Sequence, residues 1–169
     1  LGARVIATAG SADKLAIAKQ YGADDLIDYR SEDIRERVKA LTDGRGADAV
    51  YDPVGGSAFD ASLRATVPGG RILVVGFASG TVPQISANIL LVKNLSIIGY
   101  YWGAHRKLDP SLITNSFAEL LGWFKAGKIK PHVSHVFPIE DVNIAHETLT
   151  SRKSTGKVVI ITSDDARDK

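Results

Sequence analysis

The sequence of 169 residues contains no cysteine, which excludes disulfide bonds and thiolate zinc sites within this chain. A reducing compartment is allowed, and we expect a cytoplasmic protein. No apolar run reaches the ~18 residues that a membrane-spanning helix needs, and the start shows no signal-peptide pattern. The formal net charge of +2 is spread without long runs of one sign. Nothing in it therefore indicates nucleic acid or an anionic membrane as a partner.

Methionine is also absent, and the chain opens with Leu1-Gly2-Ala3 directly before an expected strand. These three residues are typical of the end of a helix whose body is missing. We therefore expect the chain to be part of a longer polypeptide, although its length suffices for one domain with a full core.

The first stretch that indicates a binding site is a strand, a turn of small residues and a helix. Residues 4–8 form a short apolar run typical of a buried parallel strand, and residues 12–20 are typical of a helix. Such a turn can bind an anion, because unpaired backbone N–H groups and the helix dipole point out of it. In dinucleotide-binding folds an acidic residue at the end of the second strand holds the ribose 2′-hydroxyl of NAD.

We interpret the strand at residues 4–8 as this second strand. Its end carries Gly10 and Ser11, with no carboxylate, and Lys14 follows in the first helical turn. A cation at that position opposes the helix dipole, and a bound phosphate would remove the conflict. Ser11 and Lys14 are therefore candidates for binding the 2′-phosphate of NADPH. In the alternative interpretation Ser11 only caps the helix and Lys14 is a solvated surface lysine.

Strands and helices alternate along the rest of the chain. The pattern predicts a helix capped by Ser31, a tight turn at residues 68–70, a loop at 101–105, and a long helix opened by Asp109 and Pro110. Further strands are expected at 25–28, 47–51, 71–76, 95–100, 133–137 and 157–161, and further helices at 57–66, 86–93 and 140–151. The long helix has an apolar face, expected to be buried, made of Ile113, Phe117, Leu120, Leu121 and Phe124. This order predicts an α/β fold, a doubly wound parallel sheet that binds its ligand at the carboxyl ends of the strands.

Several stretches, in this order, carry a resemblance to a known family. They are residues 1–11, 21–24, 28–30, 48–56, 69–77, 94–99, 145–147 and 155–159. Together they resemble the cofactor-binding half of the medium-chain dehydrogenase/reductase superfamily, and more closely the zeta-crystallin-like NADPH:quinone oxidoreductases. The resemblance implies a Rossmann-like fold that is incomplete here, because the first strand and the Gly-rich phosphate loop are absent.

The resemblance also implies a reductase that transfers hydride from NADPH to a quinone or an α,β-unsaturated carbonyl. It places the 2′-phosphate between the turn after the second strand and the end of the third. The residues that it assigns to the cofactor are Gly10, Ser11 and Lys14 with Tyr29 and Arg30 at the phosphate, Val54 and Gly55 at the adenosine, Gly76, Phe77 and Ala78 at the pyrophosphate and nicotinamide ribose, and backbone groups of Tyr100, Tyr101 and Trp102 at the carboxamide. For the aromatic residues, ordinary packing or a subunit interface is the alternative, and for Arg30 a surface charge.

The resemblance divides the chain into a partial dinucleotide-binding domain at 1–130, a strand–helix–strand segment at 131–162 that returns to an absent substrate domain, and a frayed tail at 163–169. Without the central first strand the sheet would have a gap, so we expect the 169 residues alone to bind NADPH poorly. We name no catalytic residue in this half and no metal ligand among the histidines, and zinc in the absent half stays an open question. A homodimer through the edge strand 95–100 is expected.

Three other interpretations stay open at this point. An enoyl-thioester reductase of the same superfamily would differ in its substrate domain. A relative that has lost turnover would serve as a structural or interaction protein, although no basic stripe indicates nucleic acid. A different doubly wound fold, such as a methyltransferase, would need another kind of Gly-rich loop upstream.

Overall fold

The computed structural model describes residues 2–151 and 153–162, so the expected frayed tail at 163–169 lies outside the described residues. The chain forms two compact units, Leu1–Ala104 and His105–Lys169. The first unit holds every residue assigned above to the cofactor. The expected division at residue 130 concerns the whole protein and stays a prediction.

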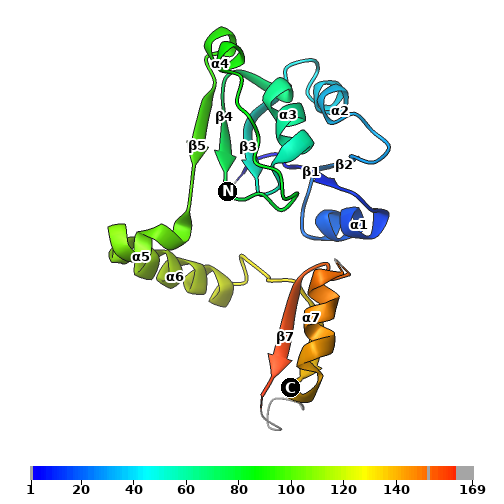
Figure 1. Ribbon diagram of the computed structural model, residues 1–169, viewed down its shortest axis with the longest axis vertical. Helices are drawn as coiled ribbons and strands as arrows, with labels where there is room; N and C mark the ends of the chain where they lie inside the picture. Colours follow the sequence, from blue (N-terminus) through cyan, green and yellow to red (C-terminus); the bar gives the residue numbers. More distant parts are fainter. Residues whose placement is uncertain (1, 152, 163–169) are drawn as a thin grey trace. The chain divides into compact units, whose positions relative to one another are not determined.

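Parallel strands and alternating helices build the first unit (Figure 1). Strand β1 pairs with β2, with Ala9 opposite Asp28, and a three-stranded sheet has the order β3-β4-β5. Its elements are β1 (Ile6–Ala9), α1 (Ala12–Gln20), β2 (Asp25–Asp28), α2 (Ile34–Leu41), β3 (Ala47–Asp52), α3 (Gly56–Ala65), β4 (Thr66–Val74), α4 (Ala87–Lys93), β5 (Ser96–Gly99) and the short 3₁₀ helix η1 (Trp102–Ala104). All pairings are parallel, which confirms the predicted α/β class.

The expected gap in the sheet is present. Among the described residues β1 pairs only with β2, and β3 pairs only with β4. Between β1 and β3 lies a hollow of about 750 Å³, lined on one side by residues 3–8 and on the other by residues 45–54. The unpaired edges of both strands face this hollow, at the place where the predicted fold has its first strand.

Two small apolar cores hold the first unit together. In one, Phe59 and Leu63 of α3 pack with Ile72 of β4 and with Leu95. In the other, Ile27 of β2 packs with Val38 of α2. Each core thus fixes a helix on the strand beside it, and with it the loop at the strand's carboxyl end.

The second unit contains a parallel strand pair, β6 with β7. Its elements are α5 (His105–Leu108), α6 (Pro110–Lys125), β6 (Val133–Pro138), η2 (Ile139–Asp141), α7 (Val142–Thr150) and β7 (Lys157–Ile161). Asp109 caps α6 as predicted, because its carboxylate accepts the backbone N–H groups of Ser111 and Leu112 at 3.1 and 3.3 Å. Among the described residues no helix has the length and hydropathy of a transmembrane segment.

The predicted start of the second helix is wrong. The helix α2 begins at Ile34, and Asp33 is its cap, because the Asp33 carboxylate accepts the Glu36 N–H at 2.9 Å. Ser31 lies in the preceding turn, where its hydroxyl donates to the Asp28 carbonyl at 3.5 Å. The hydrogen bond to Asp28 therefore closes the turn after β2 before the helix can start.

The tight turn predicted at residues 68–70 is also wrong, because these residues belong to β4. Ala47 lies opposite Thr66 but Ala49 lies opposite Arg71, so residues 67–70 bulge from the pairing with β3. Gly69 adopts a φ of +76°, which suits glycine. The Pro-Gly-Gly sequence thus forms a bulge within β4. Bulges and tight turns favour the same residues, so the sequence alone does not distinguish them.

Two further expectations fail between residues 101 and 125. The expected loop at 101–105 contains η1 and the first residue of α5. On α6 the apolar spacing is present, but none of its side chains is buried, and Phe117 and Phe124 are 51% and 55% exposed. Apolar spacing defines a helix face, whereas burial also needs a second surface to pack on.

Candidate functional site

The carboxyl ends of β1 and β2 meet, as the parallel pairing requires. The Tyr29 N–H donates to the Ala9 carbonyl at 3.2 Å. A Cβ added at Gly10 would lie 2.6 Å from the Tyr29 hydroxyl and 2.7 Å from the adjoining ring carbon. The Tyr29 ring therefore lies against the Gly10 backbone, and a side chain at position 10 would displace it.

The turn after β1 starts α1 with Ser11 as its cap. Backbone N–H of Lys14 points to the Ser11 hydroxyl at 3.5 Å, a long hydrogen bond, and Ser11 itself has extended backbone. This supports the capping role of Ser11. The Lys14 side chain is exposed and makes no ion pair within the described part of the chain. The first turn of α1, directly after Gly10, thus carries a cation that has no ion pair with any described residue.

Arg30 follows Tyr29 and is exposed. Its backbone N–H donates to the Asp28 carboxylate at 3.0 Å, and the Asp28 N–H donates to the Glu32 carboxylate at 2.9 Å. These bonds fix the backbone of the turn after β2. They leave the Arg30 guanidinium in solvent, at the same end of the strand pair as Lys14.

A second group of loops meets at the carboxyl ends of β3 and β4. The Ala78 N–H donates to the Pro53 carbonyl at 3.0 Å and the Ser79 N–H to the Val54 carbonyl at 2.9 Å. Gly55 has φ +71° and ψ −160°, and a Cβ there would lie 2.7 Å from the Thr81 carbonyl oxygen. The loop holding Val54 and Gly55 is thus joined by backbone hydrogen bonds to the loop that follows Gly76.

Gly76 and Phe77 complete this contact. A Cβ at Gly76 would lie 3.3 Å from the Pro53 carbonyl oxygen, and the Phe77 ring borders Gly55 at 3.0 Å from a Cβ built there. Phe77 is 43% exposed. The arrangement is a close-packed backbone surface with one aromatic ring at its margin, which is suited to binding a flat or extended ligand through main-chain groups.

Asp52, which the sequence reasoning missed, organises this surface. It is buried at the end of β3, and its Oδ1 accepts the N–H groups of Val54 and Gly55 at 2.8 and 3.0 Å. Its Oδ2 is buried without a hydrogen bond to any described residue. In an Asx turn the side-chain oxygen of an aspartate accepts the backbone N–H of the residue two positions later. The bond from the Val54 N–H to Asp52 has this form, and the Asp52-Pro53 pair is the sequence signal for it.

The three aromatic residues follow β5 at the same end of the sheet. The Tyr100 N–H donates to the Val74 carbonyl at 2.9 Å, which extends the pairing of β5 with β4 by one residue. The Tyr101 carbonyl accepts the Ala104 N–H in η1, and the Tyr101 side chain is 79% exposed. Tyr100 and Trp102 are 37% exposed each.

The predicted residues therefore form two groups, one on β1–β2 and one on β3–β4–β5, with the hollow between β1 and β3 separating the strands that carry them.

The described residues do not fit a metal site. No group of three or more His, Asp or Glu side chains among them could hold a metal ion, and the whole sequence contains no cysteine. His132 and His135 instead pair with the hydroxyls of Thr155 and Ser134.

A dinucleotide fits the two groups better. Glycines lie where other groups approach the backbone closely. Within the described part of the chain, Lys14 at the start of α1 has no ion pair and Asp52 keeps one buried oxygen without a hydrogen bond. These are the features with which strand ends of this fold class bind nucleotides.

Comparison with known proteins shows which family this chain resembles. The family described as zinc-binding dehydrogenase matches residues 1–125. The quinone oxidoreductase-like protein 2 homolog of Nematostella vectensis is 50% identical over 162 residues, which are 95% of this chain and 44% of that protein.

Two solved structures agree with that assignment. A quinone oxidoreductase of Pseudomonas syringae is 32% identical with a TM-score of 0.84, and the match covers 96% of this chain and 50% of that one. The quinone oxidoreductase of Escherichia coli complexed with NADPH is 33% identical, also with a TM-score of 0.84 and coverages of 96% and 50%. The chain thus spans about half the length of the proteins it matches.

Proposed function

The chain belongs to the zinc-binding dehydrogenase family, and on that premise we propose that it is the NADPH-binding part of a quinone or enone reductase. The observation that carries the proposal is the contact of the Gly10 turn with Tyr29, beside the exposed Lys14 and with no carboxylate at the end of β1. The E. coli neighbour complexed with NADPH supports the choice of cofactor.

In this proposal the two groups of residues divide the work. Lys14 and Arg30 bind the 2′-phosphate, the Ser11 hydroxyl adds a hydrogen bond, and Tyr29 forms the wall behind it. Val54 and Gly55 border the adenosine, and Gly76, Phe77 and Ala78 border the pyrophosphate and the nicotinamide ribose. Backbone groups of Tyr100, Tyr101 and Trp102 orient the carboxamide.

When bound, NADPH supplies the hydride for an electron-poor carbon of the quinone or enone. The residues of this chain contribute position, because a hydride donor held at a fixed place reacts faster than a diffusing one. The Asp52 carboxylate holds the Val54–Gly55 turn in shape through its two hydrogen bonds. We assign no proton transfer to a side chain of this chain.

Lys14→Ala in the natural full-length protein tests the proposal. Loss of a charged hydrogen bond to the phosphate should weaken NADPH binding about tenfold or more and leave NADH binding unchanged. Lys125→Ala, an exposed lysine in the last turn of α6, is the matched control and should change neither. An unchanged ratio of the two affinities in Lys14→Ala would contradict the role of Lys14.

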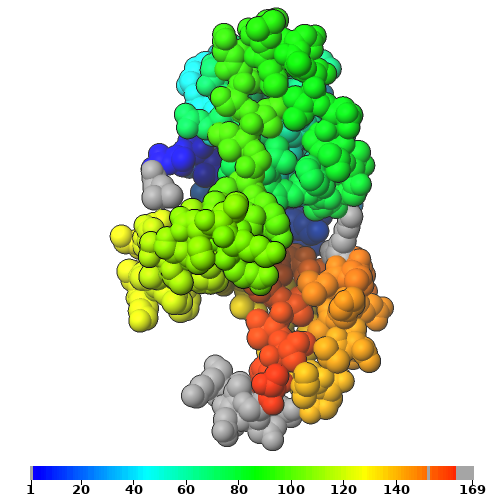
Figure 2. Space-filling view, turned by 60° about the vertical axis from the view of Figure 1, so that its left-hand side comes forward, coloured from blue at the N-terminus to red at the C-terminus, as the bar shows by residue number. Residues whose placement is uncertain are grey.

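The proposal includes a homodimer through β5. This strand is the outer strand of the three-stranded sheet, and its Ile98 is 45% exposed. Figure 2 shows α4 and β5 in green at the surface of the first unit. An unpaired apolar strand edge favours pairing with a second copy across a two-fold axis. Light scattering of the natural full-length protein should give the mass of a dimer, and a monomer would contradict this part.

A further inference from the structure

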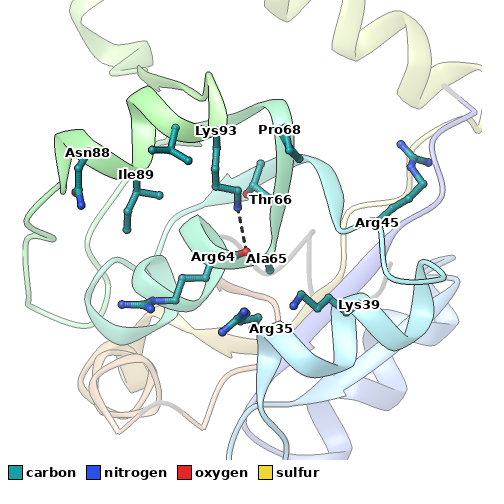
Figure 3. A pocket seen from close by; sticks show the side chains of 11 residues that line it. Arg35, Lys39, Arg45, Arg64, Ala65, Thr66, Pro68, Asn88, Ile89 and Lys93 are labelled. Atoms are coloured by element: carbon teal, nitrogen blue, oxygen red, sulfur yellow. Dashed lines mark hydrogen bonds between the residues drawn. The ribbon is translucent and has the colours of Figure 1, made fainter.

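A pocket of about 480 Å³ opens at the amino ends of β3 and β4, the opposite end of these strands from the residues assigned to the cofactor. Positive side chains line it and no carboxylate does (Figure 3). The cations are Arg35, Lys39, Arg45, Arg64 and Lys93. They come from α2, α3, α4 and the loop before β3, so only the fold brings them together.

Helix ends account for part of this cluster. Lys39, Arg64 and Lys93 lie in the last turns of α2, α3 and α4, where a cation is favourable. Nζ of Lys93 also donates to the carbonyls of Leu63 and Arg64 at 3.1 and 3.0 Å, at the end of α3. Lys93 therefore helps to close α3, and its third N–H makes no hydrogen bond to a described residue.

Helix ends do not account for Arg35. It lies in the first turn of α2, where a cation opposes the helix dipole. It is four residues before Lys39, so two like charges share one face of the helix, an arrangement that destabilises an isolated helix. Both line the pocket, and in Figure 3 they lie below the end of α3 while Lys93 comes from above.

The crowding of charge acts on Lys93. Desolvation, and after it the charges of Arg35 and Lys39, lower the pKa of the Lys93 ammonium. Within the described residues two of these cations have a carboxylate partner outside the pocket lining: Glu36 is 3.7 Å from Arg35 and Asp48 is 2.7 Å from Arg45, all with exposed side chains. Among the described residues Lys39 and Arg64 have no ion pair. The pocket thus keeps an excess of positive charge that a bound anion would neutralise.

The pocket also has an apolar wall, formed by Pro68, Ile89 and Val92. Its volume is in the range of pockets that bind small molecules. Guanidinium groups bind phosphate through two parallel hydrogen bonds, which suits several linked phosphates better than a single carboxylate. We propose that this pocket binds a small molecule in which an apolar part carries a diphosphate or triphosphate group. The proposal does not depend on which cofactor binds at the other end of the strands.

Titration of the natural full-length protein with inorganic triphosphate, monitored by calorimetry and by NMR of backbone amides, tests the proposal. Binding should shift the amides of residues 35–45, 64–66 and 88–93 and leave those of residues 10–14 and 76–78 in place. ATP should bind more tightly than inorganic triphosphate, because its base and sugar reach the apolar wall. Shifts confined to residues 10–14, or no binding of either compound, would overturn the proposal.

The variant Arg35→Gln/Lys39→Gln should bind inorganic triphosphate at least tenfold more weakly. Its thermal unfolding temperature without ligand should stay the same or rise, because two repelling charges are gone. Lys125→Gln/Lys128→Gln removes the same charge from the second unit and should bind like the original chain. Equal weakening in both variants would mean non-specific attraction and would overturn the site. A single-stranded oligonucleotide serves as the competing ligand. If it binds more tightly than ATP and its affinity falls in Arg35→Gln/Lys39→Gln, the ligand is nucleic acid and the proposed small molecule is wrong.

Discussion

The two ends of the strands in the first unit differ in what builds them. At the carboxyl ends, close backbone contacts involving Gly10, Gly55 and Gly76 shape the surface, and Lys14 and Arg30 stand at one side of it. At the amino ends, side chains from three helices and a loop shape a pocket lined by five cations, an apolar wall and no carboxylate. We propose that both ends bind anions. The first would bind them through backbone geometry and a few charges, and the second through charged side chains that four separate segments contribute.

The difference explains why only one of the two was visible in the sequence. Gly10, Ser11 and Lys14 lie within five positions, directly after a strand, so local pattern reveals them. Arg35 and Lys93 are far apart in the sequence and meet only through the packing of α2, α3 and α4. A sequence without basic runs can therefore still fold into a basic pocket.

The largest effect is expected from Gly55→Ala, which tests whether the carboxyl end depends on backbone geometry. A side chain at φ +71° and ψ −160° is strained by about 1–3 kcal/mol. The contact of the new Cβ with the Thr81 carbonyl oxygen, at 2.7 Å, adds to this. Urea denaturation should show the loss of free energy of unfolding.

Gly80→Ala is the matched control. Gly80 also has a positive φ, +82°, but a Cβ there meets no atom within 4 Å. Its free energy of unfolding should fall by less than that of Gly55→Ala. Equal losses would show that the contact with Thr81 contributes nothing.

Ser11→Asp separates the two roles assigned to Ser11. Aspartate caps a helix about as well as serine, so the free energy of unfolding should change by less than about 0.5 kcal/mol. The new carboxylate at the end of β1 should repel a 2′-phosphate and bind a 2′-hydroxyl. Fluorescence titration should then show a preference for NADH in the natural full-length protein. An unchanged preference for NADPH would show that the phosphate binds elsewhere.

The smallest effect concerns Lys93 at the amino end. Its pKa is lowered, first by desolvation and then by Arg35 and Lys39, so the folded state releases this proton before the unfolded state does. The unfolded state then binds more protons, and this group's contribution to stability rises with pH between the lowered and the ordinary pKa. In an NMR titration the Lys93 side chain should lose its proton at lower pH in the folded chain than in the same chain unfolded by urea. Coincident titrations would contradict the crowding of charge.

Much of the fold followed from local rules. The helix α1 begins after Ser11 and β2 spans residues 25–28 as expected, and Asp109 caps α6, because caps and short apolar runs act over a few residues. The failures had non-local or competing causes. Asp33 caps α2 in place of Ser31 because the Ser31 hydroxyl donates to the Asp28 carbonyl, and Phe117 stays 51% exposed.

The sequence predicted which residues of the candidate site lie together better than what each of them does. Parallel pairing of β1 with β2 sufficed to bring Gly10 to Tyr29, since the strand ends must meet. Asp52 was missed, although an aspartate ahead of Pro-Val-Gly is a recognisable turn signal. The roles depend on a bound cofactor, which the spacing of residues alone cannot supply.

The most direct test of the account is to measure the dissociation constants of NADPH and NADH for the natural full-length protein under the same salt conditions. NADPH should bind at least about tenfold more tightly than NADH, because the turn after β1 carries a lysine and no carboxylate at its start. Equal constants, or tighter binding of NADH, would contradict it.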